Sequence, residues 1–125
     1  MILKLSKTIF VFQKILMSIK LFFELIKFRL SFLVTFSAVF GFLLSSNYIN
    51  YFSLFILIIS GFFITGSSII NNQIIEKDSD KLMKRTKNRP LPTNKISSRN
   101  ALFISLALSI TGLILMVLFL NKLTA

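Results

Sequence analysis

Three of the four acidic residues of this 125-residue chain lie within five positions of one another. They are Glu76, Asp78 and Asp80, and Asn72 precedes Glu76 by four positions. If one helix continues through this stretch, Asn72, Glu76 and Asp80 share a face, because positions i, i+4 and i+8 drift by only about 40° per step. Asp78 points away from that face, and we assign it a secondary role.

The chain contains no histidine and no cysteine. Imidazole and thiolate metal ligands and histidine general bases are therefore excluded. A face of amide and carboxylate oxygens suits a hard cation such as Mg²⁺, which takes one or two carboxylates and completes its shell with water and substrate phosphates. We expect a divalent cation between the carboxylates of Glu76 and Asp80, with Asp78 in second rank, whereas Asn72 taken alone is better explained as a buried polar helix contact.

Basic residues follow the acidic face directly, among them Lys84, Arg85 and Arg89. Lysine and arginine side chains neutralise phosphate charge, and a metal ion can bridge the same phosphates. The ordered combination predicts a diphosphate site. Taken separately, the parts have simpler interpretations: basic residues anchor the cytoplasmic side of membrane proteins, and scattered acids form local salt bridges.

Composition places these residues in a membrane protein. The chain is 54% hydrophobic, with 15 phenylalanines and a formal net charge of +11. A soluble domain of this length could not bury so much apolar surface. The charges gather at the ends of apolar runs, which fits a membrane topology better than a nucleic-acid groove. We expect an all-α integral membrane protein whose partner is the lipid bilayer and not nucleic acid.

Uncharged runs predict three membrane spans, near residues 30–46, 51–75 and 100–121. The polar stretch Ser45–Asn50 supplies the first turn. Small side chains that would allow helices to approach closely are Gly41, Gly61, Gly66, Ser67 and Ser68.

The distribution of Lys and Arg predicts the orientation. Residues 76–99 and the region before the first span are basic, whereas the turn between the first two spans carries no basic residue. Both basic parts are expected on the cytoplasmic side, which leaves the C-terminus outside.

Two further parts of the chain carry local predictions. We interpret residues 1–27 as a cytoplasmic or interfacial segment, an amphipathic helix with Lys20, Glu24 and Lys27 on one face, and a transit peptide is the alternative. Pro90 and Pro92 end any helix and predict an extended connector over residues 88–95.

The acidic and basic stretch also resembles a known family. The pattern Asn72-x-x-x-Glu76-x-x-x-Asp80 resembles the first Asn/Asp-rich motif of the UbiA superfamily of intramembrane prenyltransferases. The continuation Met83-Lys-Arg-Thr-Lys-Asn-Arg-Pro-Leu91 is most similar to the haem-farnesylating branch. The segment from Glu24 to Ser31 resembles that branch's first span, although Phe28 stands where proline is common.

The resemblance implies a helical bundle around a cavity and the Mg²⁺-assisted loss of diphosphate from a prenyl diphosphate. In the haem branch, farnesyl diphosphate and haem B are the substrates. By this resemblance Asn72, Glu76 and Asp80 bind Mg²⁺ and diphosphate, with Asp78 nearby. Arg85 and Arg89 belong to the matching string, and charge extends a diphosphate contact to Lys84. A bacterial inner membrane is the expected location.

The family has nine spans and a second aspartate-rich motif, whereas no acidic residue follows Asp80 in this chain. We therefore expect an N-terminal part of a prenyltransferase, inactive until a C-terminal half or a complementing chain supplies the remainder. Two alternatives stay open. One is a sister enzyme that prenylates an aromatic or quinone precursor, and the other is a non-catalytic membrane protein whose basic loop binds anionic lipid.

Overall fold

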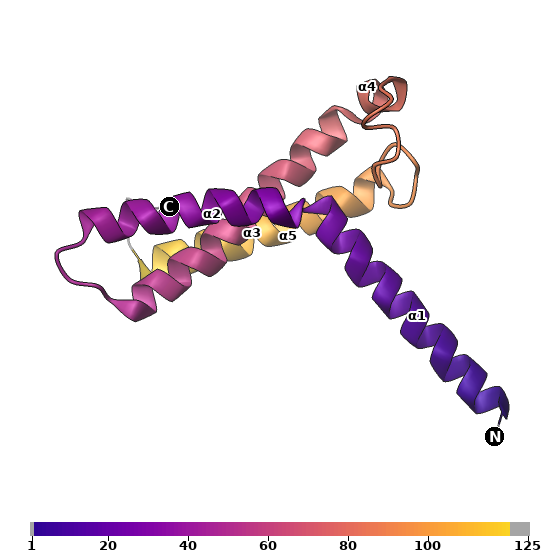
Figure 1. The fold of residues 1–125 in the computed structure, drawn as a ribbon, viewed down its shortest axis with the longest axis horizontal. Helices are drawn as coiled ribbons and strands as arrows, with labels where there is room; N and C mark the ends of the chain where they lie inside the picture. The colour runs from indigo at the N-terminus through magenta and orange to yellow at the C-terminus, as the bar shows by residue number, and fades with distance from the viewer. Residues whose placement is uncertain (1, 121–125) are drawn as a thin grey trace.

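The structure, a computed structural model, describes residues 2–120 (Figure 1). Its regular elements are all helical within that range, which confirms the expected fold class. The helices are α1 (Ile2–Leu25), α2 (Phe28–Ser45), α3 (Tyr51–Ile75), α4 (Lys77–Leu82) and α5 (Ser98–Phe119).

Three of the helices, α2, α3 and α5, are long and apolar enough to cross a membrane, with 18, 25 and 22 residues respectively. At 1.5 Å per residue these lengths correspond to about 27, 38 and 33 Å, against a hydrocarbon core of about 30 Å. Their outer surfaces carry large apolar side chains such as Phe36, Phe55 and Phe103, each more than half exposed. Surface of this kind requires a lipid or protein environment. The chain is an integral membrane protein.

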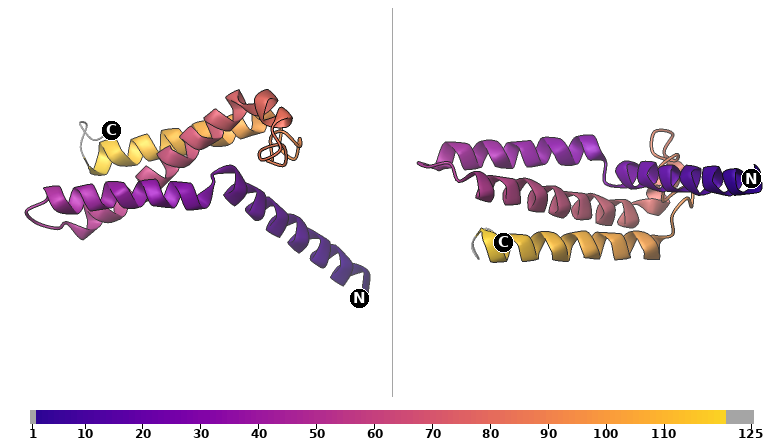
Figure 2. Two further views of the ribbon diagram at one scale, coloured as in Figure 1. Left: turned by 45° about the horizontal axis from the view of Figure 1, so that its top comes forward. Right: turned by 90° about the horizontal axis from the view of Figure 1, so that it is seen from below.

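The central helix of the bundle is α3, which packs against both α2 and α5. Figure 2 shows α3 lying between its two neighbours, with both neighbours running in the opposite direction along the chain. The turn after α2 ends at Asn50, whose side-chain oxygen accepts hydrogen bonds from the amides of Phe52 and Ser53 at 3.0 and 3.3 Å. This is an ordinary N-cap, and it fixes where α3 begins.

Small and polar side chains hold α3 and α5 close together. A Cβ atom added at Gly112 would lie 2.7 Å from Cγ1 of Ile64, so the two backbones approach too closely for any larger residue in this arrangement. The hydroxyl of Ser105 donates to Oδ1 of Asn71 at 2.7 Å and lies 3.0 Å from the hydroxyl of Ser67. Close approach and hydroxyl hydrogen bonds are the usual means of helix association in lipid.

Two of the predicted glycines also lie at helix contacts. A Cβ at Gly66 would meet Cγ2 of Ile26 at 3.4 Å, and one at Gly61 would meet Thr35 at 3.8 Å. Among residues 2–120 nothing lies within 4 Å of a Cβ added at Gly41, so the predicted close contact is not formed there.

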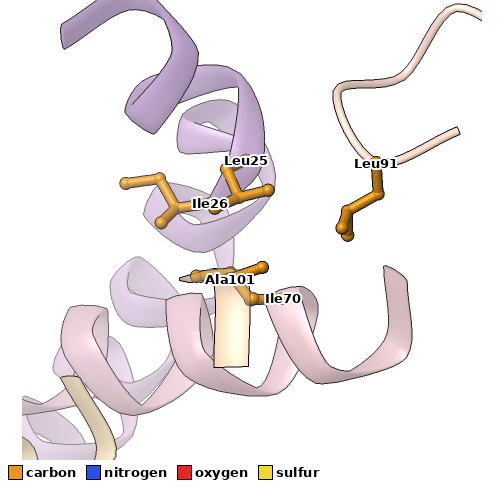
Figure 3. Packing of buried hydrophobic residues seen from close by; sticks show 5 residues of the cluster. All are labelled: Leu25, Ile26, Ile70, Leu91 and Ala101. Carbon is orange, nitrogen blue, oxygen red and sulfur yellow. The ribbon is translucent and has the colours of Figure 1, made fainter. Parts of the chain in front are cut away.

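The apolar core of the described residues lies near the ends of α1 and α3 and the start of α5, and Figure 3 shows its side chains. Its buried members are Leu25, Ile26, Ile70, Leu91 and Ala101. They come from the end of α1, from α3, from the segment between α4 and α5, and from α5. The core therefore joins the elements that carry the acidic and basic residues discussed above.

Helix α1 leaves the bundle obliquely (Figure 1). It ends at Leu25, and Lys27 adopts the left-handed conformation with φ 45° and ψ 64°. The expectation that Lys20, Glu24 and Lys27 share one continuous helical face is therefore wrong, because Lys27 lies beyond the end of α1. The new direction is stabilised by Ser31, whose hydroxyl donates to the carbonyl of Ile26 at 2.7 Å.

The stretch between α4 and α5, residues 83–97, is hereafter the connecting segment. It is folded into successive turns, so the predicted extended connector over 88–95 is wrong. The amides of Thr93 and Lys95 donate to the carbonyls of Arg89 and Pro90 at 3.2 and 3.0 Å. Proline fixes φ near −65°, which suits turns as well as extended chain. The buried side chain of Leu91 holds these turns against the core.

Candidate functional site

The predicted acidic face spans the junction between α3 and α4. The helix is interrupted at Glu76, which has φ −83° and ψ 0°. The amide of Glu76 still donates to the carbonyl of Asn72 at 2.9 Å, and the amide of Asp80 donates to the carbonyl of Glu76 at 2.8 Å. The i to i−4 spacing that links the three residues therefore survives the interruption.

The interruption also changes the electrostatics of the acids. In one continuous helix they would lie near its C-terminus, where the helix dipole disfavours carboxylates. Instead, Asp78 and Asp80 lie in the first turn of α4, where the dipole favours them.

Glu76 and Asp80 converge on a single guanidinium nitrogen. Nη1 of Arg89 lies 2.6 Å from Oδ2 of Asp80 and 3.7 Å from Oε2 of Glu76. The Asp80 side chain is only 5% exposed, whereas that of Glu76 is 59% exposed. One carboxylate of the pair is thus buried behind the arginine, and the other is open.

Asp80 is held by its backbone as well as by its side chain. The hydroxyl of Thr86, a buried residue, donates to the carbonyl of Asp80 at 3.1 Å. The backbone amide of Arg89 in turn donates a hydrogen bond to the carbonyl of Thr86 at 3.0 Å. These contacts fold the connecting segment back over α4 and make the arginine part of the same unit as the carboxylate.

The other two predicted ligands are exposed. Asn72 lies one helical turn before Glu76, with an exposed side chain that the backbone places on the same side of α3. The Asp78 side chain is 96% exposed and lies 3.7 Å from Nζ of Lys81. Asp78 is therefore directed away from the converging pair, as its position in the sequence indicates.

Lys84 and Arg85 are exposed in the connecting segment. A further cation, Lys27, contributes to this end of the bundle and did not enter the predicted site. Burial lowers the pKa of the Lys27 ammonium below its ordinary value, and the charge of Arg89 adds to this effect, while Asp80 and Glu76 oppose it. Lys27 lies in the α1–α2 junction, 49 positions before Glu76, and sequence spacing gives no signal that the two charges influence one another.

The residues present fit a magnesium ion in their chemistry. Glu76 and Asp80 carry the carboxylate oxygens that Mg²⁺ prefers, and Asn72 adds an amide oxygen donor one turn earlier. Within residues 2–120 no group of three acidic, histidine or cysteine side chains converges on a point. The donors therefore suit Mg²⁺ in type, and the described side chains do not by themselves complete a coordination shell.

A large apolar groove lies elsewhere on the bundle. It has a volume of about 520 Å³ between α2 and α3, and its lining includes Phe28, Phe36, Phe62 and Phe63. On α3, the lining residues Ile58, Ile59, Phe62 and Phe63 lie 9 to 14 positions before Asn72, which is about 14–21 Å along the helix axis. The groove therefore lies deeper along the bundle than the acidic face.

The structure is thus a bundle of membrane-spanning helices with acidic and basic side chains gathered at one end. Comparison with known proteins identifies the family to which such a chain belongs. Residues 33–125 match the sequence profile of the family described as the UbiA prenyltransferase family. The chain belongs to the UbiA prenyltransferase family.

Relatives with known names narrow the similarity further. The chain is 41% identical over 99 residues to a protoheme IX farnesyltransferase from Cytophaga hutchinsonii, which aligns 78% of this chain with 35% of that protein. It is 43% identical over 95 residues to the protein of the same name from Flavobacterium psychrophilum, aligning 74% of this chain with 32% of the relative. The predicted similarity to the haem-farnesylating branch is confirmed.

A more distant relative of the same name, from Caldivirga maquilingensis, is 36% identical over 102 residues and aligns 81% of this chain with 36% of its own length. The chain thus spans about a third of the length of the curated relatives it matches. No solved structure matches the chain.

Proposed function

We propose that this chain forms the first part of a haem O synthase, an enzyme that transfers the farnesyl group of farnesyl diphosphate to a vinyl group of haem B. The observation that carries the proposal is the convergence of Glu76 and Asp80 on Nη1 of Arg89 at the polar end of the bundle. The names of the similar proteins, protoheme IX farnesyltransferases, support the same reaction class.

In this proposal Asn72, Glu76 and Asp80 hold Mg²⁺, the exposed Lys84 and Arg85 contact the diphosphate, and Arg89 contributes its charge from its place against the carboxylates. When bound, Mg²⁺ would offset the negative charge that develops on the departing diphosphate. The chain's own residues have the remaining task of orienting the diphosphate at the end of the bundle. Lys27 adds a cation to this set from the α1–α2 junction.

We place the site on the cytoplasmic side of a bacterial inner membrane. The basic residues of the connecting segment and of the region before α2 lie at the same end of the bundle, and the positive-inside rule assigns that end to the cytoplasm. A second aspartate-rich motif would come from the C-terminal part of the protein or from a complementing chain. The 125-residue chain alone is expected to be inactive.

The proposal is tested by complementation. The chain is co-expressed with the part of the Cytophaga hutchinsonii relative that lies beyond the alignment, and haem extracts are analysed by mass spectrometry for the mass of farnesylated haem. We expect haem O with the native chain and with Asp78→Asn, and at least about a hundredfold less with Glu76→Gln, since catalytic electrostatics of this kind contribute 10²- to 10³-fold.

Two results would contradict the proposal. Prenylation of an added quinone or aromatic acid, but not of haem, would favour the sister enzyme. Equal activity of the Glu76→Gln and native chains would remove the acidic face from the reaction and leave the lipid-binding alternative.

A further inference from the structure

Arg89 contacts both carboxylates and is itself largely covered, with a side chain only 22% exposed. A residue that binds diphosphate needs free donors directed at the ligand. Arg89 instead donates its shortest hydrogen bond, at 2.6 Å, to a carboxylate that is itself buried. Its contacts therefore suit a role within the protein better than a role at the ligand.

The surroundings of Asp80 support the same interpretation. A buried carboxylate needs a charged partner, because removing either member of such a pair leaves an uncompensated buried charge. Asp80 has this partner in Arg89, and its carbonyl accepts a hydrogen bond from Thr86 of the same segment. Lys84 and Arg85, by contrast, are exposed, and the described contacts include no ion pair between either of them and a carboxylate.

We propose that Arg89 is a positioning residue: it holds Asp80 and Glu76 together and locks the connecting segment over α4, and the diphosphate is met by Arg85 and Lys84 instead. This inference rests on the proposed function for the purpose of the carboxylates. The part of the inference that concerns closure of the connecting segment over α4 does not depend on that function. One experiment tests this closure, and a second tests the positioning of the carboxylates.

The first experiment measures amide hydrogen exchange of the full 125-residue chain in lipid nanodiscs. The amides of Lys87, Thr93 and Asn94 donate hydrogen bonds within the connecting segment and report its closure. In Arg89→Gln we expect their exchange to accelerate at least about tenfold, because breaking a buried ion pair releases the turns that depend on it. Lys84→Gln is the matched control and should leave the exchange unchanged.

Pairing with Asp80 is tested by combining variants. If the two side chains act as one unit, Asp80→Asn and the double variant Asp80→Asn/Arg89→Gln should exchange about as fast as Arg89→Gln alone. Arg89→Lys keeps the charge and loses the planar fork, so its exchange should fall between native and Arg89→Gln. An amide exchange rate in Arg89→Gln within twofold of the native rate would contradict the inference that Arg89 closes the connecting segment. Independent, additive effects of the Asp80 and Arg89 substitutions would contradict it too.

The second experiment measures Mn²⁺ binding to the same proteins by electron paramagnetic resonance. Positioning predicts at least about fivefold weaker binding in Arg89→Gln, because the carboxylates no longer converge. Leu91→Ala loosens the segment but keeps both members of the Arg89–Asp80 pair, so it should accelerate exchange and weaken Mn²⁺ binding less than Arg89→Gln does. This contrast separates positioning of the carboxylates from simple folding of the segment.

The direction of the change in Mn²⁺ affinity shows whether Arg89 positions the carboxylates, has no effect on the cation, or competes with it. Unchanged or tighter binding in Arg89→Gln would overturn positioning, since it would make the arginine indifferent to the cation or a competitor for its site. Absence of Mn²⁺ binding in the native chain and in every variant would contradict the proposed metal site, while the exchange experiment would still decide whether Arg89 closes the connecting segment.

Discussion

The side-chain amide of Gln73 donates a hydrogen bond to the carbonyl oxygen of Leu25 at 2.6 Å. This contact joins the last turns of α3 to the last residue of α1, and Gln73 is only 2% exposed. The bond fixes the chain two residues before Lys27, whose left-handed conformation starts the new direction of α2. A buried side-chain amide thus connects the path of the first helix to the geometry of the site.

Gln73→Ala should destabilise the protein by about 1–3 kcal/mol, because it leaves the buried carbonyl of Leu25 without its donor. Thermal unfolding in detergent micelles measures the change. Ser68→Ala, at an exposed position of the same helix, is the control and should stay within about 0.5 kcal/mol of native. Equal stability of the two variants would show that the link between α1 and α3 contributes nothing.

Gly112→Ala should destabilise the contact between α3 and α5 by about 1–3 kcal/mol, as expected for overpacking. The added methyl group would meet Cγ1 of Ile64 at 2.7 Å and the carbonyl of Ser60 at 3.1 Å. The matched control is Gly41→Ala, which adds a methyl group into open space within a helix and should be neutral or slightly stabilising. The same unfolding measurement compares them, and the reverse order of stability would contradict the close packing of α3 and α5.

Lys27 offers a test of the junction between α1 and α2. Its left-handed conformation costs a side-chain-bearing residue about 1 kcal/mol that glycine avoids. Lys27→Gly should therefore be about 1 kcal/mol more stable than Lys27→Ala, and the comparison cancels the loss of charge common to both. Equal stability of these two variants would indicate that residue 27 does not adopt a left-handed conformation.

Much of the fold follows from patterns that are local in sequence. Uncharged runs that are long enough to cross the hydrocarbon core, separated by a polar turn that ends at Asn50, predict long apolar helices. The structure has α2, α3 and α5 at these positions. The spacing of Asn72, Glu76 and Asp80 also sufficed to predict that Asp78 would point away from the acidic face, and its 96% exposed side chain agrees.

Other features depend on contacts between distant positions, which spacing does not encode. Nothing in the local sequence around Gly112 distinguishes it from Gly41, yet one lies at a helix crossing and the other faces open space. The turns of the connecting segment depend on Leu91 reaching the core, and this contact overrides the tendency of two prolines toward extended chain. The pairing of Arg89 with Asp80 requires that same folding of the segment.

The proposed function requires that the acidic face holds a diphosphate through a divalent cation. Isothermal titration calorimetry tests this requirement by measuring the affinity of the complemented protein for farnesyl diphosphate in the presence and absence of Mg²⁺. We predict binding that requires Mg²⁺, is retained in Asp78→Asn and falls at least about tenfold in Glu76→Gln, the loss of one charge-assisted contact. Binding of equal strength without Mg²⁺, or in Glu76→Gln, would contradict this requirement.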